Sequence, residues 1–436
     1  DQSTFDVYDA LTLADIRQTC DLFLPVYKKT QGEHGFVSLE VMPSLAHDEQ
    51  RTLAEARRLF KAVARPNVLI KIPATREGLP AIRAALSEGI NINITLMFSL
   101  NHYQEVANAY LEGLASCKAK RGGDLRQIHS VASVFVSRID TYVDKRLEEL
   151  SASTGISKEL CQSLKGKAAV ANSKLIYEGF KEIFNSEKFK KLQASGARVQ
   201  KVLWGSTSTK NPSYSDLIYV ENLVGAETVN TMPLNTLEAL LDHGIVRPNT
   251  LEEGLEEARL IVADLERLGL NLLEVGEALQ REGVTAFSDS FDALMRTLER
   301  ECARYRNRRK KSALISVSYS LLPLQAGFCH SRESGNPKRG FPIKSFGNDN
   351  YKTDKAPSAS SEGEELRASL QNFQQQNKLE RFFKKDPSLW KEDAAHQEVI
   401  KNRLGWLDLP DWMLGKLYEI ELLREELLAE KIKSIV

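Results

Sequence analysis

The sequence has few cysteines and no close pairs of metal-binding residues. Five cysteines are scattered through the 436 residues, at Cys20, Cys117, Cys161, Cys302 and Cys329. This spacing indicates neither a disulfide framework nor a zinc site, and it is typical of a reducing compartment. The opening stretch DQSTFDVYDA is acidic and polar, so it lacks the features of a signal peptide. We therefore expect a cytoplasmic protein without a metal ion.

An excess of charge of either sign is also missing. Lys and Arg together number 59, and Asp and Glu together number 59. A balanced chain gives no reason to expect nucleic acid as a partner. The longest apolar candidate segment, residues 306–328, is interrupted by serines, a proline and a glutamine. We expect no membrane span from it, and a small-molecule function is favoured.

What the sequence does contain is a regular alternation of short β-branched runs and longer amphipathic stretches, up to about residue 305. This alternation predicts βα units around a parallel sheet. Six units are visible, whereas a closed (β/α)₈ TIM-type barrel needs eight. We expect a TIM-type α/β barrel of which two units are not visible; the family resemblance described below implies that they are missing at the amino terminus. The runs cover residues 35–41, 67–74, 89–98, 129–136, 200–206 and 226–232, with helical patterns at 48–64, 78–89 and 99–117 between some of them.

Three of these runs separate apolar from polar residues with a period of two. Asn93 and Thr95 alternate with isoleucines, Glu40 alternates with Leu39 and Val41, and Lys71 lies within the run NVLIKIPATREG. Successive side chains of a strand point to opposite faces. We expect the apolar faces to pack on the helices and the polar faces to line the barrel interior.

Lys71 is unusual because a buried ammonium is costly unless it is paired or neutral. Two interpretations remain open from the residues alone. Lys71 could form a structural ion pair with Glu40 on the neighbouring strand. Alternatively, it could be a nucleophile that forms a Schiff base with a carbonyl substrate.

The motifs VSLEV, LIKIPAT, EGININITLMFS, SVASVFVSRID, LWGSTSTKNP and TVNTMP occur in this order. Together they closely resemble transaldolase over residues 1–303, specifically the long bacterial form that is sometimes fused to glucose-6-phosphate isomerase. The resemblance implies that Lys71 is the Schiff-base lysine of a pentose phosphate pathway enzyme. Such an enzyme transfers a dihydroxyacetone unit from sedoheptulose 7-phosphate or fructose 6-phosphate to glyceraldehyde 3-phosphate or erythrose 4-phosphate, and it needs no cofactor or metal.

The resemblance also implies roles for residues of the barrel interior. Glu40 and Thr95 match the pair that holds a water for proton transfer. Asn93 and Ser133 match residues that bind substrate hydroxyls. The alternatives are an ion pair for Glu40 and ordinary hydrogen-bonded filling of the interior for Asn93 and Ser133.

A phosphate site is implied by three further matches. Arg138, which follows a predicted strand, matches the family's phosphate-binding arginine, and a guanidinium suits a phosphate. Ser206 and Lys210 resemble the remaining phosphate ligands. Lys210 could equally be a solvated charge in a loop, and Phe135 could shape the pocket or belong to the core.

The chain also departs from the family pattern. The family has two strands ahead of the run at 35–41, of which the first provides an acid/base aspartate and the second a substrate-binding asparagine in a TSNP-like turn. Neither is recognisable here, and Asp6, Asp9 and Asp15 lie in a helical-looking segment. A barrel without two strands has open edges, which favours instability or a homo-oligomer.

The composition changes after residue 305. Residues 306–362 are rich in Ser, Gly, Pro, Asn and Lys, which predicts an irregular linker. Residues 363–436 include KLERFFKKDPSLW and LGWLDLPDWM, which resemble the start of the isomerase domain, and we expect no isomerase activity. Two other functions remain open: a Schiff-base aldolase acting on fructose 6-phosphate, or a non-catalytic remnant that binds sugar phosphates.

Overall fold

Six parallel strands form the centre of the protein. The computed structural model describes residues 3–120, 124–152 and 157–320, with side chains up to Arg304. Neighbouring strands pair in chain order, so β1 and β6 are the edges of the sheet. This confirms the six predicted strands and the TIM-type α/β architecture, here with one open side. The strands are β1 (Val37–Glu40), β2 (Val68–Pro73), β3 (Ile92–Met97), β4 (Ser130–Phe135), β5 (Lys201–Gly205) and β6 (Thr228–Asn230).

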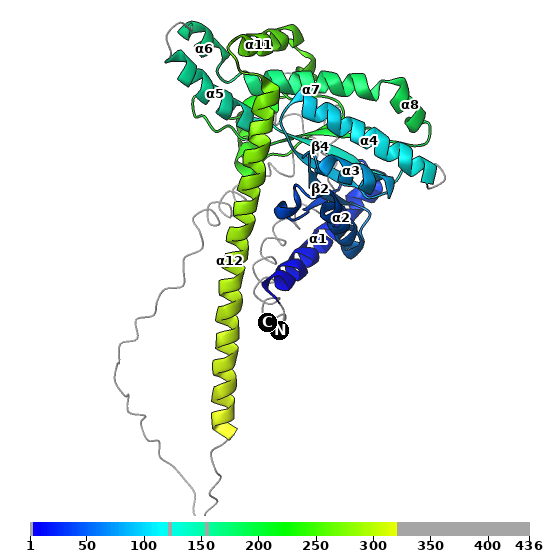
Figure 1. Ribbon diagram of the computed structural model, residues 1–436, viewed down its shortest axis with the longest axis vertical. Coiled ribbons are helices and arrows are strands. Elements are labelled where there is room, and N and C mark those ends of the chain that lie inside the picture. Colours follow the sequence, from blue (N-terminus) through cyan, green and yellow to red (C-terminus); the bar gives the residue numbers. More distant parts are fainter. Residues whose placement is uncertain (1–2, 121–123, 153–156, 321–436) are drawn as a thin grey trace, which may run out of the picture.

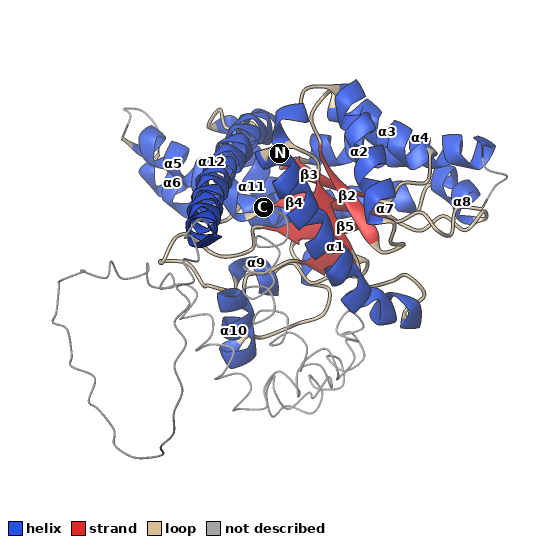
Figure 2. Ribbon diagram, turned by 90° about the horizontal axis from the view of Figure 1, so that it is seen from below, coloured by secondary structure: helices blue, strands red, loops and turns tan. Residues whose placement is uncertain are grey.

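Helices surround this sheet (Figure 2). The predicted helical patterns are confirmed as α2, α3 and α4, which pack against one another and against the strands. In α2, the buried residues Thr52, Ala56, Leu59 and Val63 have the three- and four-residue spacing of one helix face. The helices are α1 (Thr4–Lys29), α2 (Glu49–Val63), α3 (Gly78–Ser87), α4 (Leu100–Lys120), α5 (Ser137–Ser151), α6 (Lys158–Leu164), α7 (Ala168–Phe184), α8 (Glu187–Gln193), α9 (Ile218–Glu221), α10 (Leu234–His243), α11 (Leu255–Arg267) and α12 (Leu272–Ser320).

The outward faces of the strands form the apolar core. Ile70, Ile72, Ile92 and Ile94 are completely buried between the sheet and the helices. Burying an aliphatic side chain of this size stabilises the fold by about 1.5–3 kcal/mol. The core is therefore outside the barrel, and the strand faces that point inward carry the polar groups.

The segment that precedes β1 is the long helix α1, as its pattern predicted. Asp6 caps the start of this helix through a reciprocal pair of hydrogen bonds with Ser3. Asp9 forms an ion pair with Arg58 of α2, at 2.7 Å. Two of the three aspartates considered above thus serve the helix start and the contact between helices.

Helix α12 projects from the body of the protein (Figure 1) and continues to Ser320. The expected start of an irregular linker at residue 306 is therefore wrong. The sequence contains no proline or glycine between residues 306 and 322, so nothing in it interrupts the helix. Residues 321–362 of the predicted linker and the predicted isomerase-like segment, 363–436, lie outside the described residues.

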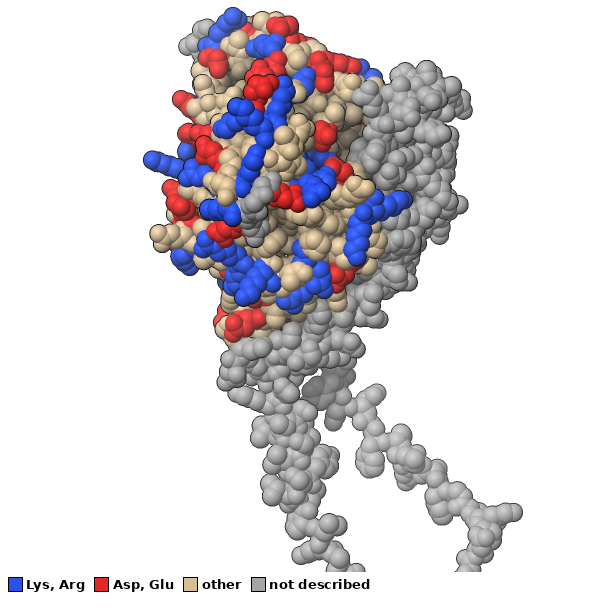
Figure 3. Space-filling model, turned by 90° about the vertical axis from the view of Figure 1, so that its right-hand side faces the viewer, with Lys and Arg blue, Asp and Glu red and all other residues tan. Residues whose placement is uncertain are grey.

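Charges of both signs are interspersed on the face drawn in Figure 3, in keeping with the 59 basic and 59 acidic residues of the chain. Among the helices that the structure describes, none combines the length and the apolar composition needed to cross a lipid bilayer.

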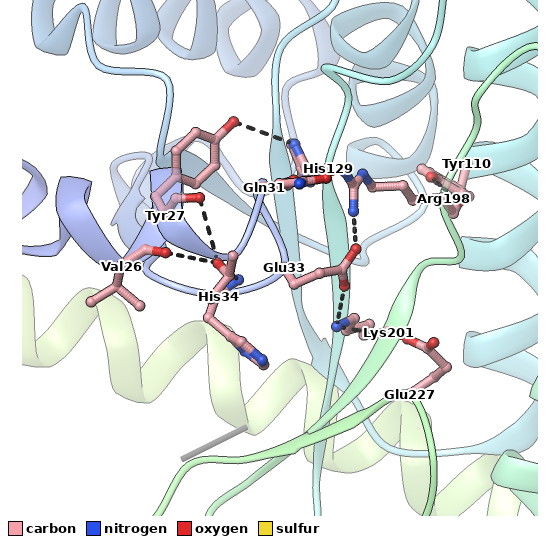
Figure 4. A network of polar contacts seen from close by, with 11 residues as sticks. Val26, Tyr27, Gln31, Glu33, His34, Tyr110, His129, Arg198, Lys201 and Glu227 are labelled. Atoms are coloured by element: carbon pink, nitrogen blue, oxygen red, sulfur yellow. Dashed lines mark hydrogen bonds and ion pairs between the residues drawn. The ribbon is translucent and has the colours of Figure 1, made fainter. Parts of the chain in front are cut away.

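Ion pairs bridge the open side of the sheet at one end (Figure 4). Glu33, in the loop before β1, accepts hydrogen bonds from the guanidinium of Arg198 and from Lys201 Nζ, the latter at 2.9 Å. Lys201 begins β5 and also lies 3.7 Å from Glu227, directly before β6. Arg198 donates a second hydrogen bond to the carbonyl of Gln31, at 2.7 Å. These contacts connect the loop before β1 to β5 and β6, although the edge strands themselves do not pair.

Gly78 provides a test of how tightly the end of β2 is packed. A Cβ atom at this first residue of α3 would lie 2.1 Å from the carbonyl oxygen of Pro73. We expect Gly78→Ala to lower the free energy of unfolding by about 1–3 kcal/mol, because backbone must move to admit the methyl group. Urea unfolding measures this. Gly205→Ala is the control, since its nearest neighbour would be 3.6 Å away. Equal losses for the two variants would contradict the expected close packing.

Candidate active site

Lys71 and Glu40 lie side by side because β1 and β2 pair in parallel with these two residues in register. Lys71 Nζ donates a hydrogen bond to Glu40 Oε2 at 3.1 Å. The two side chains are 21% and 29% exposed, so neither is fully removed from water. The predicted contact between the lysine and the glutamate is thus confirmed, and it fixes the position of the amine.

Polar side chains continue across the next two strands. Ser133 Oγ donates a hydrogen bond to Asn93 Oδ1 at 2.6 Å, and Asn93 Nδ2 donates to Ser38 Oγ at 2.9 Å. Asn93 and Ser133 are 5% and 2% exposed. These contacts join β1, β3 and β4 on the side of the sheet where Lys71 and Glu40 lie. The prediction that the interior is polar is confirmed here.

Thr95 is also buried, two residues beyond Asn93 on β3. Its Oγ1 atom has no hydrogen-bond partner among the described residues. A buried polar atom without a partner costs about 1–3 kcal/mol. Thr95 Oγ1 is one of six such side-chain atoms among the described residues, so its lack of a partner fits a ligand or water but is not specific to a site. Thr95 does not belong to the residues that line the cavity described next.

Five of the predicted site residues, together with Phe135, line one cavity of about 820 Å³, whereas Thr95, Arg138 and Lys210 do not; the five are Glu40, Lys71, Asn93, Ser133 and Ser206. Small-molecule sites typically have volumes of about 300–1,000 Å³. The cavity extends to Glu33, His129 and Lys201 near the open side of the sheet.

Burial lowers the pKa of His129 to about 4, and the positive charge of Lys201 contributes to this lowering. Asp6, Asp9 and Asp15 are not among the lining residues.

Arg138 lies in the first turn of α5, directly after β4. Its guanidinium carbon is 5.4 Å from the centre of the Phe135 ring. The side chain is half-buried, and it forms no ion pair with a carboxylate of the described residues. A half-buried guanidinium without a carboxylate partner is suited to an anionic ligand. Arg138 is outside the cavity lining, so it would meet a ligand at the rim.

Ser206 is held beside the start of α5. Its Oγ atom lies 2.9 Å from Ser137 Oγ, and its carbonyl accepts a hydrogen bond from the Ser137 amide at 3.0 Å. Ser206 has a φ of 54°, a left-handed conformation that is unfavourable for a residue with a side chain. Arg138 and Ser206 are thus neighbours. Lys210 is exposed and donates to Ser208 Oγ at 2.7 Å, so its interpretation as a solvated charge remains open.

Helix α12 covers the carboxyl ends of the central strands. Gln280 Nε2 donates hydrogen bonds to the carbonyls of Ala74 and Leu96, at 2.9 and 3.0 Å. Two turns further along the same face of α12, the centre of the Phe287 ring lies 5.6 Å from Lys71 Nζ. The lysine therefore has a carboxylate on one side and an aromatic ring on another.

Together these groups place an amine, a carboxylate, an amide and hydroxyls around one cavity. Such a set can add an amine to a carbonyl carbon, move protons and bind sugar hydroxyls. Within the part of the chain that the structure describes, no three His, Cys, Asp or Glu residues are arranged to hold a metal ion.

Comparisons with known proteins agree with this arrangement. A sequence model of the family described as Transaldolase/Fructose-6-phosphate aldolase matches residues 1–298. The chain belongs to this family. The transaldolase of Parafrankia sp. (strain EAN1pec) is 47% identical over 292 residues, which are 67% of this chain and 77% of that protein.

Other transaldolases are similar to a comparable extent. That of Mycolicibacterium smegmatis is 47% identical over 285 residues, 65% of this chain and 75% of that protein. That of Trichodesmium erythraeum is 43% identical over 304 residues, 68% of this chain and 79% of that protein. The chain is thus an enzyme of the transaldolase/fructose-6-phosphate aldolase family, built on a parallel α/β barrel.

The sequence analysis did not identify several residues that lie near Lys71 or on the helix that covers it. Gln280 and Phe287 are seven residues apart, the spacing that puts two residues on one face of a helix, and this was the available signal. Tyr8 of α1 contacts Phe291 of α12 edge-on, with ring centres 5.2 Å apart. Burial raises the pKa of Tyr8, and the nearby Glu40 contributes to the shift. No sequence signal indicated Tyr8, because its contact joins the first and last described helices.

Gln280→Ala tests how α12 is attached. Removing the amide leaves the carbonyls of Ala74 and Leu96 without this donor, and we expect a loss of about 1–3 kcal/mol in the free energy of unfolding. Urea unfolding gives the value, and Glu282→Ala on the exposed side of the same helix is the control. If both variants lose the same stability, the two hydrogen bonds do not attach α12 to the strands.

Proposed function

We propose that the chain acts as a transaldolase, with Lys71 as its Schiff-base nucleophile. The observation that carries this proposal is the position of Lys71 Nζ, 3.1 Å from Glu40 Oε2 and inside a cavity lined by polar groups. A carboxylate at this distance can accept a proton from the ammonium, which makes the amine nucleophilic.

The reaction begins when the neutral amine of Lys71 adds to the ketone carbon of sedoheptulose 7-phosphate or fructose 6-phosphate. Loss of water gives an iminium, which accepts the electron pair of the carbon–carbon bond that then breaks. This cleavage releases erythrose 4-phosphate or glyceraldehyde 3-phosphate and leaves a dihydroxyacetone unit on the lysine as an enamine. The enamine attacks the aldehyde of a second aldose phosphate, and water then hydrolyses the new iminium.

The other site residues have the following roles in this proposal. Glu40 and Thr95 hold the water that carries protons, and the unsatisfied buried hydroxyl of Thr95 supports this. Asn93 and Ser133 bind hydroxyls of the sugar, while Arg138, Ser206 and Lys210 bind its phosphate. Arg138 is supported by its lack of a carboxylate partner among the described residues.

Some finer parts of the proposal depend on the sequence. Cysteine usage supports a cytoplasmic location, the open side of the sheet supports association as a homo-oligomer, and a sequence resemblance supports the isomerase-like character of residues 363–436. The boundaries 1–305, 306–362 and 363–436 remain predictions apart from the helical residues 306–320.

Lys71 can be tested by chemical trapping. We expect borohydride to reduce the iminium formed from fructose 6-phosphate and to leave a stable adduct on the peptide that contains Lys71, as mass spectrometry would detect. Lys71→Ala should abolish the adduct. Lys201→Met is the matched control, because Lys201 lines the same cavity. Circular dichroism should accompany each sample. An adduct on Lys201, or none in a folded wild-type sample, would contradict the proposal.

Two alternatives make different predictions about products. An aldolase would release free dihydroxyacetone from fructose 6-phosphate without an acceptor, whereas we expect product to depend on added erythrose 4-phosphate. Chromatographic analysis with and without the acceptor separates the two. A non-catalytic binder, which the missing strand with the family's acid/base aspartate would favour, would give calorimetric binding of fructose 6-phosphate but no product in either case.

A further inference from the structure

Helix α5 carries two buried carboxylates to which the proposed mechanism gives no role. Asp140 and Asp144 are four residues apart, so they lie on the same face of the helix. They are 1% and 9% exposed. Burial raises the pKa of both, to about 6 in the case of Asp140. Neither forms an ion pair within 4 Å with a residue that the structure describes, and such buried charges need other hydrogen-bond partners.

Each carboxylate accepts hydrogen bonds from the same two kinds of donor, one backbone amide and one tyrosine hydroxyl. One oxygen of Asp140 accepts from the Ala169 amide at 2.8 Å, and the other accepts from the hydroxyl of Tyr219 at 2.8 Å. One oxygen of Asp144 accepts from the Gly166 amide at 2.9 Å, and the other accepts from the hydroxyl of Tyr214 at 2.7 Å. The amides belong to the start of α7 and the turn before it.

The two tyrosines belong to the segment that follows β5. Tyr214 lies in the loop that carries Ser206 and Lys210, and Tyr219 lies on α9, where this loop ends. Gly166 makes room for the ring of Tyr214, because a Cβ atom there would lie 2.7 Å from its Cζ atom. The tyrosine is therefore fitted into place by a glycine as well as by a carboxylate.

The loop is consequently attached to α5 at both of its ends. At its start, Ser206 contacts Ser137 in the first turn of α5 through both backbone and side chain. At its end, Tyr219 is held by Asp140, one turn further along the same helix, and Tyr214 is held by Asp144, two turns further along. Arg138 itself lies in the first turn of α5. All three proposed phosphate ligands therefore lie either on α5 or in the loop attached to it.

We propose that Asp140 and Asp144, through Tyr219 and Tyr214, are positioning residues that hold the loop of Ser206 and Lys210 against Arg138 to form the phosphate subsite. This rests on the proposed function of that site. The carboxylates do not touch the substrate. They fix the loop, and the strained conformation of Ser206 is maintained by the contacts on both sides of it.

The test removes the two hydroxyl groups and keeps the rings, in the variant Tyr214→Phe/Tyr219→Phe, with Tyr214→Phe alone as a milder change. Tyr177→Phe is the matched control, since its hydroxyl donates to the carbonyl of Ala226 at 3.1 Å, away from α5. We expect the double variant to raise KM for fructose 6-phosphate about tenfold, because a displaced loop would weaken about one hydrogen bond to the charged phosphate of the substrate. The control should leave KM unchanged.

Two further measurements separate positioning from a general loss of structure. Borohydride trapping of dihydroxyacetone, which has no phosphate, should be as fast in the double variant as in the wild type, because Lys71 is unaffected. Calorimetry with inorganic phosphate should show affinity weakened by the same factor as KM. Unchanged KM and phosphate affinity in a folded double variant would overturn the proposal, as would equal losses in dihydroxyacetone trapping.

The phosphate measurement also distinguishes failure of the proposed function from failure of this inference. If the wild type traps no substrate but binds inorganic phosphate more tightly than the double variant, the catalytic proposal fails and the positioning role stands. If the wild type binds no phosphate, the positioning role is overturned. Should the double variant not fold, the same comparison with Tyr214→Phe alone decides the question, with a smaller expected change in affinity.

Discussion

The parallel pairing of β1 with β2 is the constraint on which the site depends, because it sets Glu40 beside Lys71. An ammonium within a strand loses much of its hydration, and a carboxylate on the adjacent strand compensates for part of that loss. The two interpretations that the sequence left open, an ion pair or a nucleophile, are therefore not exclusive. The contact that stabilises the lysine in the fold is also the contact through which its proton can leave.

The remaining groups depend on the same pairing through the strands that follow. Asn93 is in register with Lys71, and Ser133 reaches Asn93 from β4. Helix α12 then covers the amine with Phe287, and α1 meets α12 through Tyr8 and Phe291. The sheet thus provides the polar groups, α12 places an aromatic ring beside the amine, and α1 packs against α12.

Much of this arrangement could be predicted from local sequence, since it depends on local periodicity. The alternation around Lys71 and Asn93 identified the inward face, because side-chain direction in a strand is fixed by the backbone. The role of Gln280 could not be predicted, because its partners are carbonyls more than 180 positions away. The buried carboxylates of α5 escaped notice for the same reason. The start of the linker was misplaced because the Ser, Gly, Pro, Asn and Lys content of residues 306–362 was taken to apply from residue 306, although no proline or glycine interrupts the helix between residue 306 and Ser320.

The separation in sequence between Lys71 and its cover has a consequence for biosynthesis. Gln280 bonds to Ala74 across 206 positions. Chains are synthesised at about 5–20 residues per second, so Phe287 leaves the ribosome on the order of ten seconds or more after Lys71. During that interval the first strands have emerged without the helix that covers them. The cover that Phe287 provides for Lys71 in the folded protein can therefore form only after nearly all of the barrel sequence has been synthesised.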